Sequence, residues 1–434
     1  MTTSYVHDLP LDERSARDIA ARGLRYRRVA NDGPEFDAFL GAVARGFLDP
    51  EPTDEQIADS RDALSIRRLT AVFDDEGVHP DRPVATIDSW RAELTTSPGT
   101  VVPMWSISGV SVAPTHRRRG IATALIGGEL RTAADAGYAL AGLTVSEATI
   151  YGRWGFSPAV FTADWRVDTR RARWIGPSPE GRLDFVETGE IAGRLERLHE
   201  RFRLAHPGEV SGWPALWRRT AGLRPGADEN RKVRAVVHRR DGEDRGILVY
   251  SLAAAGRDFG GHELQVRTLL ALDADATAAL WRFALEHDLV DAVTATLQSV
   301  EGPLRWMISD QRALKVDVTD HHWLRILDVP RALSARTYAA PADLVLRVTD
   351  PLGFAEGVYR FGVAPDGTAA IERADEDAPV DAALDVGALA SALLGGVRWS
   401  ALAAAGRVTG APETVAILDG AFVPAVAPSL SIWY

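Results

Sequence analysis

The segment SVAPTHRRRGIATAL, residues 111–125, constrains the fold more than any other part of the chain. It joins a strand-like apolar segment that ends near Val112 to a helix-like apolar segment that begins near Gly120. The first turn of a helix has unpaired N–H groups and a partial positive charge, so such an end binds phosphate. Gly120 and Ala122 let the backbone approach a diphosphate, and the arginines at 117–119 add charge-assisted hydrogen bonds. The pattern predicts a pyrophosphate-binding loop; the alternative is a solvated basic loop that caps a helix.

Strand-like and helix-like segments alternate on both sides of this loop. Apolar periodicity predicts strands over residues 67–75, 82–90, 101–112, 138–145 and 156–167. Helices are predicted over residues 34–48, 119–137 and 146–155. Residues 1–33 are charged and irregular, which indicates a mobile arm. We therefore expect an α+β domain over residues 1–168.

The same order of elements recurs later in the chain. Strands are predicted over 232–240, 247–255, 262–272 and 291–298, with a helix over 274–288, which indicates a second copy over residues 169–320. Where the first copy has its arginines, the second has Asp273 and Asp275 and no glycine, and these carboxylates would repel a diphosphate.

A third region, residues 321–434, alternates as strands over 344–350, 357–363 and 368–374 and then as short alanine-rich helices. A chain of 434 residues is long enough for two or three such domains.

Charge and composition limit the possible partners. The net charge of −11 makes nucleic acid an unfavourable partner and attracts cationic amines. The chain has no cysteine, which excludes disulfides, a thiol nucleophile and thiolate metal sites and fits a reducing cytoplasm. No window approaches the ~18 apolar residues that span a membrane. The first 20 residues contain no apolar signal core. We expect a cytoplasmic protein without a membrane span, and leave open secretion without a signal peptide.

The motif VSVAPTHRRRG at 110–120, with SEATIYGRWGF at 146–156, resembles the GCN5-related N-acetyltransferases. More narrowly it is similar to the Eis-type (enhanced intracellular survival) acetyltransferases of actinobacteria, over nearly the whole chain. The resemblance implies tandem acetyltransferase domains, the second degenerate, and a C-terminal domain like sterol carrier proteins. It also implies acetyl transfer from acetyl-CoA to primary amines, including those of aminoglycoside antibiotics, with polyamines and protein lysines as other acceptors, and assembly as a homohexamer.

The resemblance also assigns residues to the cofactor. A strand end would bind the pantetheine arm through its backbone, the arginine loop would bind the pyrophosphate, and a second loop would complete the site. The cofactor-binding residues that it implies are Val110, Ser111, Val112, Arg118, Arg119, Gly120, Ile121, Ala122, Thr123, Ser146 and Glu147.

The family's general acid falls on Tyr151. A phenol has an ordinary pKa of about 10, close enough to that of a thiol to protonate the CoA thiolate as it leaves. The alternative is that Tyr151 is an aromatic packing residue, as we expect for the neighbouring Trp154 and Phe156.

The last residues, SLSIWY, are apolar, which predicts that this segment is buried. A buried carboxylate is costly unless it has partners or a task. The resemblance implies that the main-chain carboxylate of Tyr434 reaches the active site and helps to deprotonate the attacking amine. The alternative is that the aromatic tail only seals a domain interface.

Other conspicuous residues have ordinary explanations beside functional ones. We expect no metal at His321 and His322, because adjacent strand residues point to opposite faces and no ligand pattern accompanies them. His116 is expected to shape the arginine loop, and Trp105 either lines the acceptor site or belongs to the core. The acidic segment 49–60 either attracts amines or forms a capped helix start.

The leading hypothesis is an acetyl-CoA-dependent N-acetyltransferase of aminoglycoside-like polycations. Transfer would be direct within a ternary complex, because no cysteine is available to carry an acetyl group. The alternative from another class is an interaction protein that binds CoA and an apolar ligand. Tyr151 discriminates between them, because a binding protein needs no acid at that position.

Overall fold

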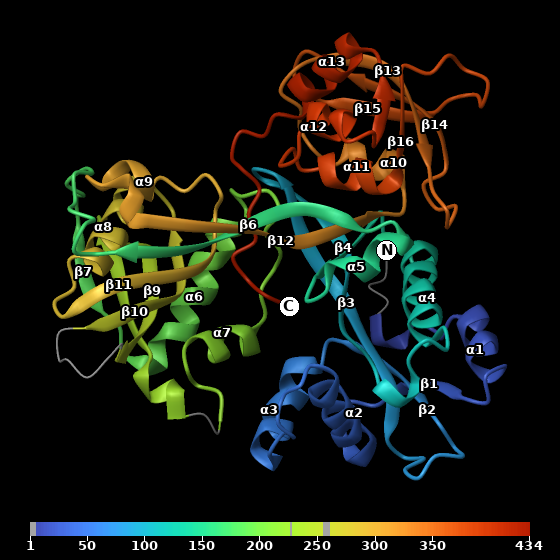
Figure 1. Cartoon of the computed structure of the whole chain (residues 1–434), viewed down its shortest axis with the longest axis horizontal. Helices are drawn as coiled ribbons and strands as arrows, with labels where there is room; N and C mark the ends of the chain where they lie inside the picture. The colour runs from blue at the N-terminus through green and yellow to red at the C-terminus, as the bar shows by residue number, and fades with distance from the viewer. Residues whose placement is uncertain (1–5, 226–227, 255–260) are drawn as a thin grey trace.

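Figure 1 shows the computed structural model of the chain, which describes residues 6–225, 228–254 and 261–434. Three parts are visible: the blue and teal N-terminal part, the green and yellow middle part, and the orange and red C-terminal part. A 12-stranded sheet runs through the first two parts, and a separate 5-stranded sheet forms the third. The end of the predicted strand over 247–255 and residues 1–5 of the predicted arm lie outside the described residues.

The N-terminal part contains five strands of the large sheet. These are β1 (Arg25–Val29), β2 (Arg68–Phe73), β3 (Pro83–Ser97), β4 (Thr100–Val112) and β5 (Leu140–Thr144). Its helices are α1 (Glu13–Ala20), α2 (Gly33–Gly46), α3 (Asp54–Leu64), α4 (Ile121–Asp135) and α5 (Ala148–Tyr151). β1 to β4 are antiparallel neighbours, and α4 is the crossover to the parallel strand β5. The sequence predicted these elements apart from α1 and β1, and it offered the start of α3 only as one of two alternatives for the acidic segment.

The prediction of an irregular arm over residues 1–33 is wrong for its second half. Asp12 accepts a hydrogen bond from the N–H of Ser15 and caps α1, and Ile19 is fully buried in the core. Asp12 also receives the guanidinium of Arg131 from α4 at 2.7 Å. The charged residues therefore form a structured segment because their partners come from elsewhere in the fold.

The parallel strands β4 and β5 pair only at Trp105–Ala141 and Ser106–Gly142 and then separate. Beyond this point β4 bulges away from β3. Two residues of β4, Gly109 and Val110, lie opposite the single residue Ile87 of β3. Gly109 has φ +60°, and a Cβ there would lie 2.3 Å from Asp88 Oδ2, so the bulge requires glycine. The separation leaves a gap between the two strands at the end nearest α4 and α5.

The middle part continues the same sheet. Its strands are β6 (Ser157–Asp168), β7 (Arg182–Phe185), β8 (Arg234–Arg240), β9 (Glu243–Ala254), β10 (His262–Ala271), β11 (Val290–Gln298) and β12 (Leu314–Ile326). Its helices are α6 (Thr188–Arg203), α7 (Pro214–Thr220), α8 (Ala274–Leu285) and α9 (Leu304–Met307). β10 and β11 are parallel and joined by α8, as β4 and β5 are joined by α4. The predicted second copy of the architecture is confirmed.

The two copies share their long strands. The sheet order is β1-β2-β3-β4-β5-β12-β6-β11-β10-β9-β8-β7, so β12 lies between β5 and β6. β12 pairs with β5 over residues 322–326 and with β6 over residues 314–324. The predicted boundary between residues 320 and 321 therefore falls inside a continuous strand, which ends at Ile326.

The C-terminal part contains β13 (Ala342–Thr349), β14 (Gly357–Val363), β15 (Ala369–Arg373), β16 (Ala382–Asp385) and β17 (Val408–Gly410). Its helices are α10 (Val329–Ser334), α11 (Val386–Ala392), α12 (Trp399–Ala404) and α13 (Pro412–Phe422). A buried ion pair between Arg325 of β12 and Asp350 joins this part to the large sheet at 2.7 Å. After α13 the tail, residues 423–434, returns to the junction of the other two parts (Figure 1).

Candidate active site

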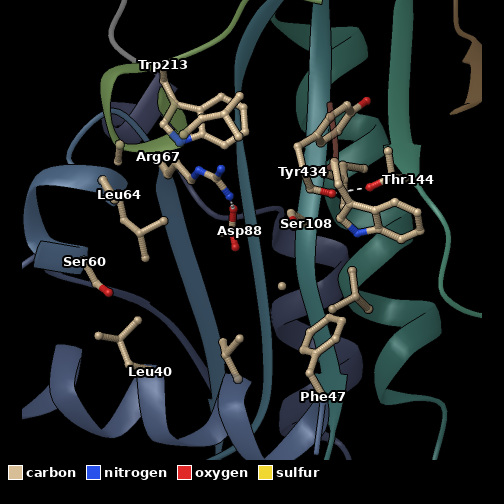
Figure 2. A pocket seen from close by; sticks show the side chains of 18 of the residues that line it. Leu40, Phe47, Ser60, Leu64, Arg67, Asp88, Ser108, Thr144, Trp213 and Tyr434 are labelled. Atoms are coloured by element: carbon tan, nitrogen blue, oxygen red, sulfur yellow. Dashed lines mark hydrogen bonds and ion pairs between the residues drawn. The ribbon is translucent and has the colours of Figure 1, made fainter. Parts of the chain in front are cut away.

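A cavity of 410 Å³ lies beside the gap between β4 and β5. Figure 2 shows it from close by, with Leu40 of α2 and Ser60 of α3 on one side and Thr144 and Tyr434 on the other. All three parts of the molecule contribute, because α7 and the last two residues of the tail also line it. The predicted site residues Val110, Ser146, Tyr151 and Tyr434 all line this cavity.

Tyr151 ends the short helix α5, and its side chain is 7% exposed. Burial, with a smaller contribution from the Glu147 carboxylate, raises the pKa of Tyr151 to about 12. The ring packs near Trp154 and Phe156, with centroids 6.2 and 6.3 Å away. Tyr151 therefore stays protonated at neutral pH, and it lies in the cavity wall as well as in the aromatic cluster.

Tyr434 enters the cavity from the tail, whose burial the sequence predicted. Leu430, Ile432 and Tyr434 are each less than a tenth exposed. The hydroxyl of Thr144 donates a hydrogen bond to the main-chain oxygen of Tyr434, shown dashed in Figure 2. The Tyr434 hydroxyl lies 2.7 Å from His322 Nε2, and burial lowers the pKa of His322 to about 3. The imidazole is thus neutral, so its Nε2 can accept a hydrogen bond from the phenol hydroxyl.

An ion pair that the sequence did not suggest forms another wall. Arg67 donates to Asp88 Oδ1 at 2.7 Å, and both side chains are less than a tenth exposed (Figure 2). The guanidinium lies 3.8 Å from the ring centre of Trp90 and 5.2 Å from that of Trp213. A carboxylate inside the apolar strand VATIDSW was the available signal for Asp88. No local pattern could indicate that Trp213, from the second copy, would join it.

The predicted pyrophosphate loop leads into an uncapped helix end. α4 has no side-chain cap, and its N-cap is Gly120 in the left-handed region at φ +73°. The arginines at 117–119 are exposed, and Arg22 Nε donates to the main-chain oxygen of Arg119 at 2.6 Å. His116 Nε2 lies 3.0 Å from Asp74 Oδ2 and holds the loop, as predicted. No side chain caps the N-terminus of α4, so the N–H groups of its first turn could bind a phosphate group.

The other residues assigned to the cofactor differ in their burial and contacts. Ser111 turns away from the cavity, because its hydroxyl lies 2.8 Å from that of Thr86. Ile121 is buried at 1% exposure, so only its main-chain N–H faces the helix end, whereas Thr123 is exposed. Glu147 is the N-cap residue of α5 and makes no capping bond. Val112 and Ala122 are half-buried between these positions.

The second copy differs at the corresponding helix end. Asp273 caps α8 by accepting from the N–H of Ala276 at 2.8 Å. Its other oxygen receives Arg245 Nε at 2.8 Å, and Arg240 pairs with both Asp273 and Asp275. The first turn of α8 thus already has a carboxylate where the first copy has an open helix end.

The remaining candidates have structural roles. Trp105 is fully buried, donates to Glu129 Oε2 at 3.2 Å and does not line the cavity, so the core alternative holds. Thr53 caps α3 in a capping box with Gln56, which is the helix-start alternative for the acidic segment. Asp49 and Asp59 of that segment nevertheless line the cavity.

His321 and His322 lie within β12, not at its start. Both contact the tail: His321 Nε2 lies 2.8 Å from the main-chain oxygen of Ile432, and His322 contacts Tyr434. The register of β12 against β6 is irregular at these residues. Among the described residues, no group of three or more metal-ligating side chains is found. Over the same residues, no helix has the length and apolar character to cross a membrane.

Comparison with protein families divides the chain as the fold does. An acetyltransferase (GNAT) domain matches residues 25–159, and a second GNAT family matches residues 208–326. A sterol carrier protein domain matches residues 329–431. The α+β architecture of two acetyltransferase-like domains followed by a sterol-carrier-like domain is therefore confirmed.

Similar proteins cover most of the chain. An uncharacterised N-acetyltransferase of Streptomyces avermitilis is 35% identical over 89% of this chain and 93% of its own length. N-acetyltransferase Eis of Mycobacterium tuberculosis is 34% identical over 81% of this chain and 86% of its own length. The crystal structure of Eis1 from Mycobacterium abscessus superposes with a TM-score of 0.80 at 28% identity, covering 95% of this chain and 100% of that one.

Proposed function

The chain belongs to the family of Eis-type N-acetyltransferases, and from this premise we propose that it transfers acetyl directly from acetyl-CoA to primary amines of aminoglycoside-like polycations. Family membership makes it an N-acetyltransferase and removes the alternative of a CoA-binding interaction protein. Acetyl-CoA is the cosubstrate that a GNAT domain implies. The observation that carries the finer proposal is one cavity lined by Tyr151, Tyr434 and the separated strand β4.

The open end of α4 and the 410 Å³ cavity lie at the two ends of the cofactor path we propose. The exposed arginines and the uncapped first turn would bind the pyrophosphate. The bulged end of β4 would pair with the amides of the pantetheine arm, because its main chain is no longer bonded to β5 there. The proposed contacts are Val110, Ser111, Val112, Arg118, Arg119, Gly120, Ile121, Ala122, Thr123, Ser146 and Glu147.

In the proposed transfer the amine nitrogen attacks the thioester carbonyl carbon, a C–N bond forms and the C–S bond breaks. The sulfur leaves with the electron pair, and Tyr151 donates its phenolic proton to it. The attacking nitrogen loses one proton, which the main-chain carboxylate of Tyr434 accepts directly or through water. An α-carboxyl has an ordinary pKa near 3.3–3.7 and is a weak base. Its attraction for the substrate ammonium therefore contributes as well.

The electrostatic support for a polycationic acceptor comes from carboxylates around the cavity. Asp49 and Asp59 line it, although Asp59 also pairs with Arg218 at 3.2 Å, and the cations Arg219 and Arg224 line it as well. The net charge of −11 adds a long-range attraction for cations. A cavity of 410 Å³ lies within the usual range for small-molecule sites. These features favour a small polyamine such as an aminoglycoside over a lysine on a folded protein.

The test is thiol release from acetyl-CoA with a panel that contains an aminoglycoside, spermidine and a lysine peptide. We expect the largest kcat/KM for the aminoglycoside, with mass spectrometry showing one added acetyl group per amine modified. A lysine peptide that outperforms the other two acceptors would replace this proposal with protein acetylation.

The role of the carboxylate is tested by extending the chain with a few residues after Tyr434. The extension moves the carboxylate and keeps the aromatic side chains that pack in the tail. We expect kcat to fall while the melting temperature is unchanged. A native rate in a properly folded extended chain would show that the tail only seals the interface.

Assembly as a homohexamer, which rests on the family resemblance, and a cytoplasmic location, which fits a chain without cysteine, are further proposals. Light scattering tests the first, since six chains of 47.0 kDa are readily distinguished from one. A monomer at working concentration would exclude the hexamer.

A further inference from the structure

A fully buried carboxylate of the second acetyltransferase-like domain holds the tail. Glu209 lies in the loop between α6 and α7, and its side chain is 0% exposed. A buried carboxylate is strongly disfavoured unless it is hydrogen-bonded or paired. The groups that bond to the Glu209 carboxylate therefore indicate its structural role.

Three of the contacts to this carboxylate come from the tail. The N–H of Ser431 donates to Oε1 at 2.8 Å, and the Ser429 hydroxyl donates to the same oxygen at 3.1 Å. The Ser431 hydroxyl donates to Oε2 at 2.9 Å. From its own domain, His199 Nε2 lies 3.6 Å from Oε2. The tail thus supplies hydrogen bonds that offset the free-energy cost of burying the Glu209 carboxylate.

The main chain around Glu209 connects the first domain to the tail. The N–H of Thr95, in β3, donates to the main-chain oxygen of Glu209 at 2.9 Å, and Gly208 donates back to Thr95 at 2.8 Å. On the other side, the N–H of Ser429 donates to Pro207 at 2.9 Å. Gly208 has φ +92°, and a Cβ there would lie 2.7 Å from the oxygen of Ser429. The loop that contains Gly208 and Glu209 is therefore closely packed between β3 and the tail.

The tail reaches the cavity at Trp433, two residues after Ser431. Along the way His321 contacts the main-chain oxygen of Ile432, and His322 contacts the Tyr434 hydroxyl. Thr144 donates to the main-chain oxygen of Tyr434. Each of these contacts requires the tail to approach β12 and β5 from the position that Glu209 gives it.

We propose that Glu209 is a positioning residue for the active site of the first domain. It touches no substrate; it anchors residues 429–431 so that the main chain of Tyr434 is held in the cavity. This inference rests on the proposed function for its catalytic consequence, but the anchoring itself does not. It gives the second domain, whose own helix end is closed by Asp273, a task in the reaction of the first.

The first test measures the anchor without any acetylation. Carboxypeptidase A removes a C-terminal aromatic residue only when the chain end is accessible. We expect Glu209→Ala to release Tyr434 about 10- to 100-fold faster than wild type, because the tail opens more often. Glu200→Ala is the matched control: it removes a carboxylate from the end of α6 that bonds Arg203 and not the tail. Melting temperatures of both variants establish that the fold is intact.

The second test separates positioning from a structural role by kinetics. We expect Glu209→Ala to lower kcat about 10- to 100-fold and to leave the KM for acetyl-CoA unchanged. Glu209→Gln keeps an acceptor for the Ser431 N–H and an amide that can donate to its hydroxyl, so it should restore kcat to within about threefold. With residues 431–434 deleted, adding Glu209→Ala should change kcat no further, since both changes act through the tail.

Faster release from Glu209→Ala supports the anchor even if wild type acetylates none of the amines, a result that overturns the proposed function alone. Release at the wild-type rate overturns the anchor, whatever the activity. Faster release with an unchanged kcat overturns the positioning role. A further fall in kcat when Glu209→Ala is added to the deletion does the same, because it reveals a route that bypasses the tail.

Discussion

Replacing Tyr151 with phenylalanine removes one oxygen atom from the cavity wall and leaves the ring in place. The ring keeps its neighbours Trp154 and Phe156, at centroid distances of 6.2 and 6.3 Å, so the fold and CoA binding should survive. The substitution should therefore lower kcat without changing the fold or the affinity for CoA. A positioned acid contributes about 10²–10⁴ to the rate.

The pKa of Tyr151 narrows this range. Burial raises that pKa to about 12, whereas a thiol has an ordinary pKa of about 8.5. Proton transfer from the phenol to the departing sulfur is uphill by that difference, so Tyr151 is a weak general acid for this step. We therefore expect kcat to fall by about 10², the lower end of the range, which corresponds to about 2.7 kcal/mol in the barrier.

The assay is thiol release from acetyl-CoA at saturating amine, with calorimetry for CoA affinity and thermal unfolding for the fold. Tyr138→Phe is the matched control, because burial also raises the pKa of Tyr138 but its ring packs on Trp105 outside the cavity. We expect the control to keep its kcat. Wild-type turnover in Tyr151→Phe, or an equal loss in both variants, would refute the assignment of Tyr151 as the acid.

Three further predictions follow from other parts of the structure. Calorimetric titration should give one CoA per chain, because Asp273 already caps the helix end of the second copy; two equivalents would contradict this. Gly109→Ala should lower the free energy of unfolding in urea by about 3–5 kcal/mol, since its Cβ would displace the buried Asp88 from Arg67; a loss below 1 kcal/mol would mean that the bulge accommodates a side chain. The pKa of His322 is lowered to about 3, so between about pH 6.5 and 3 the unfolded chain binds a proton that the folded chain does not. Its contribution to stability should then fall by about 1.4 kcal/mol per pH unit on acidification, and urea titrations of His322→Gln should show a correspondingly smaller slope.

The sequence was sufficient where the relevant residues are close together in it. The strand, arginine loop and helix of residues 111–125 are specified by local periodicity and by Gly120, and the structure has them as expected. The irregular arm was a wrong prediction because Asp12 finds its cation, Arg131, on a distant helix.

Local sequence patterns did not predict which strands pair when they are far apart in the sequence. Alternation predicts that a segment is a strand, but not which strand it lies beside. The insertion of β12 between β5 and β6 could therefore not be read from residues 314–326 themselves. The same holds for the cavity, since Trp213 and Tyr434 reach it only through the arrangement of the second and third domains.

The strand exchange makes the two acetyltransferase-like halves a single folding unit. A fragment that stops at residue 168 would keep β5 but lose β12, and the exposed edge of β5 would pair with other chains. We therefore expect neither half to fold when it is expressed alone, and calorimetry should resolve one transition for both. β12, the last strand of the second domain, completes the sheet of the first domain, so the first domain depends on the second for its fold.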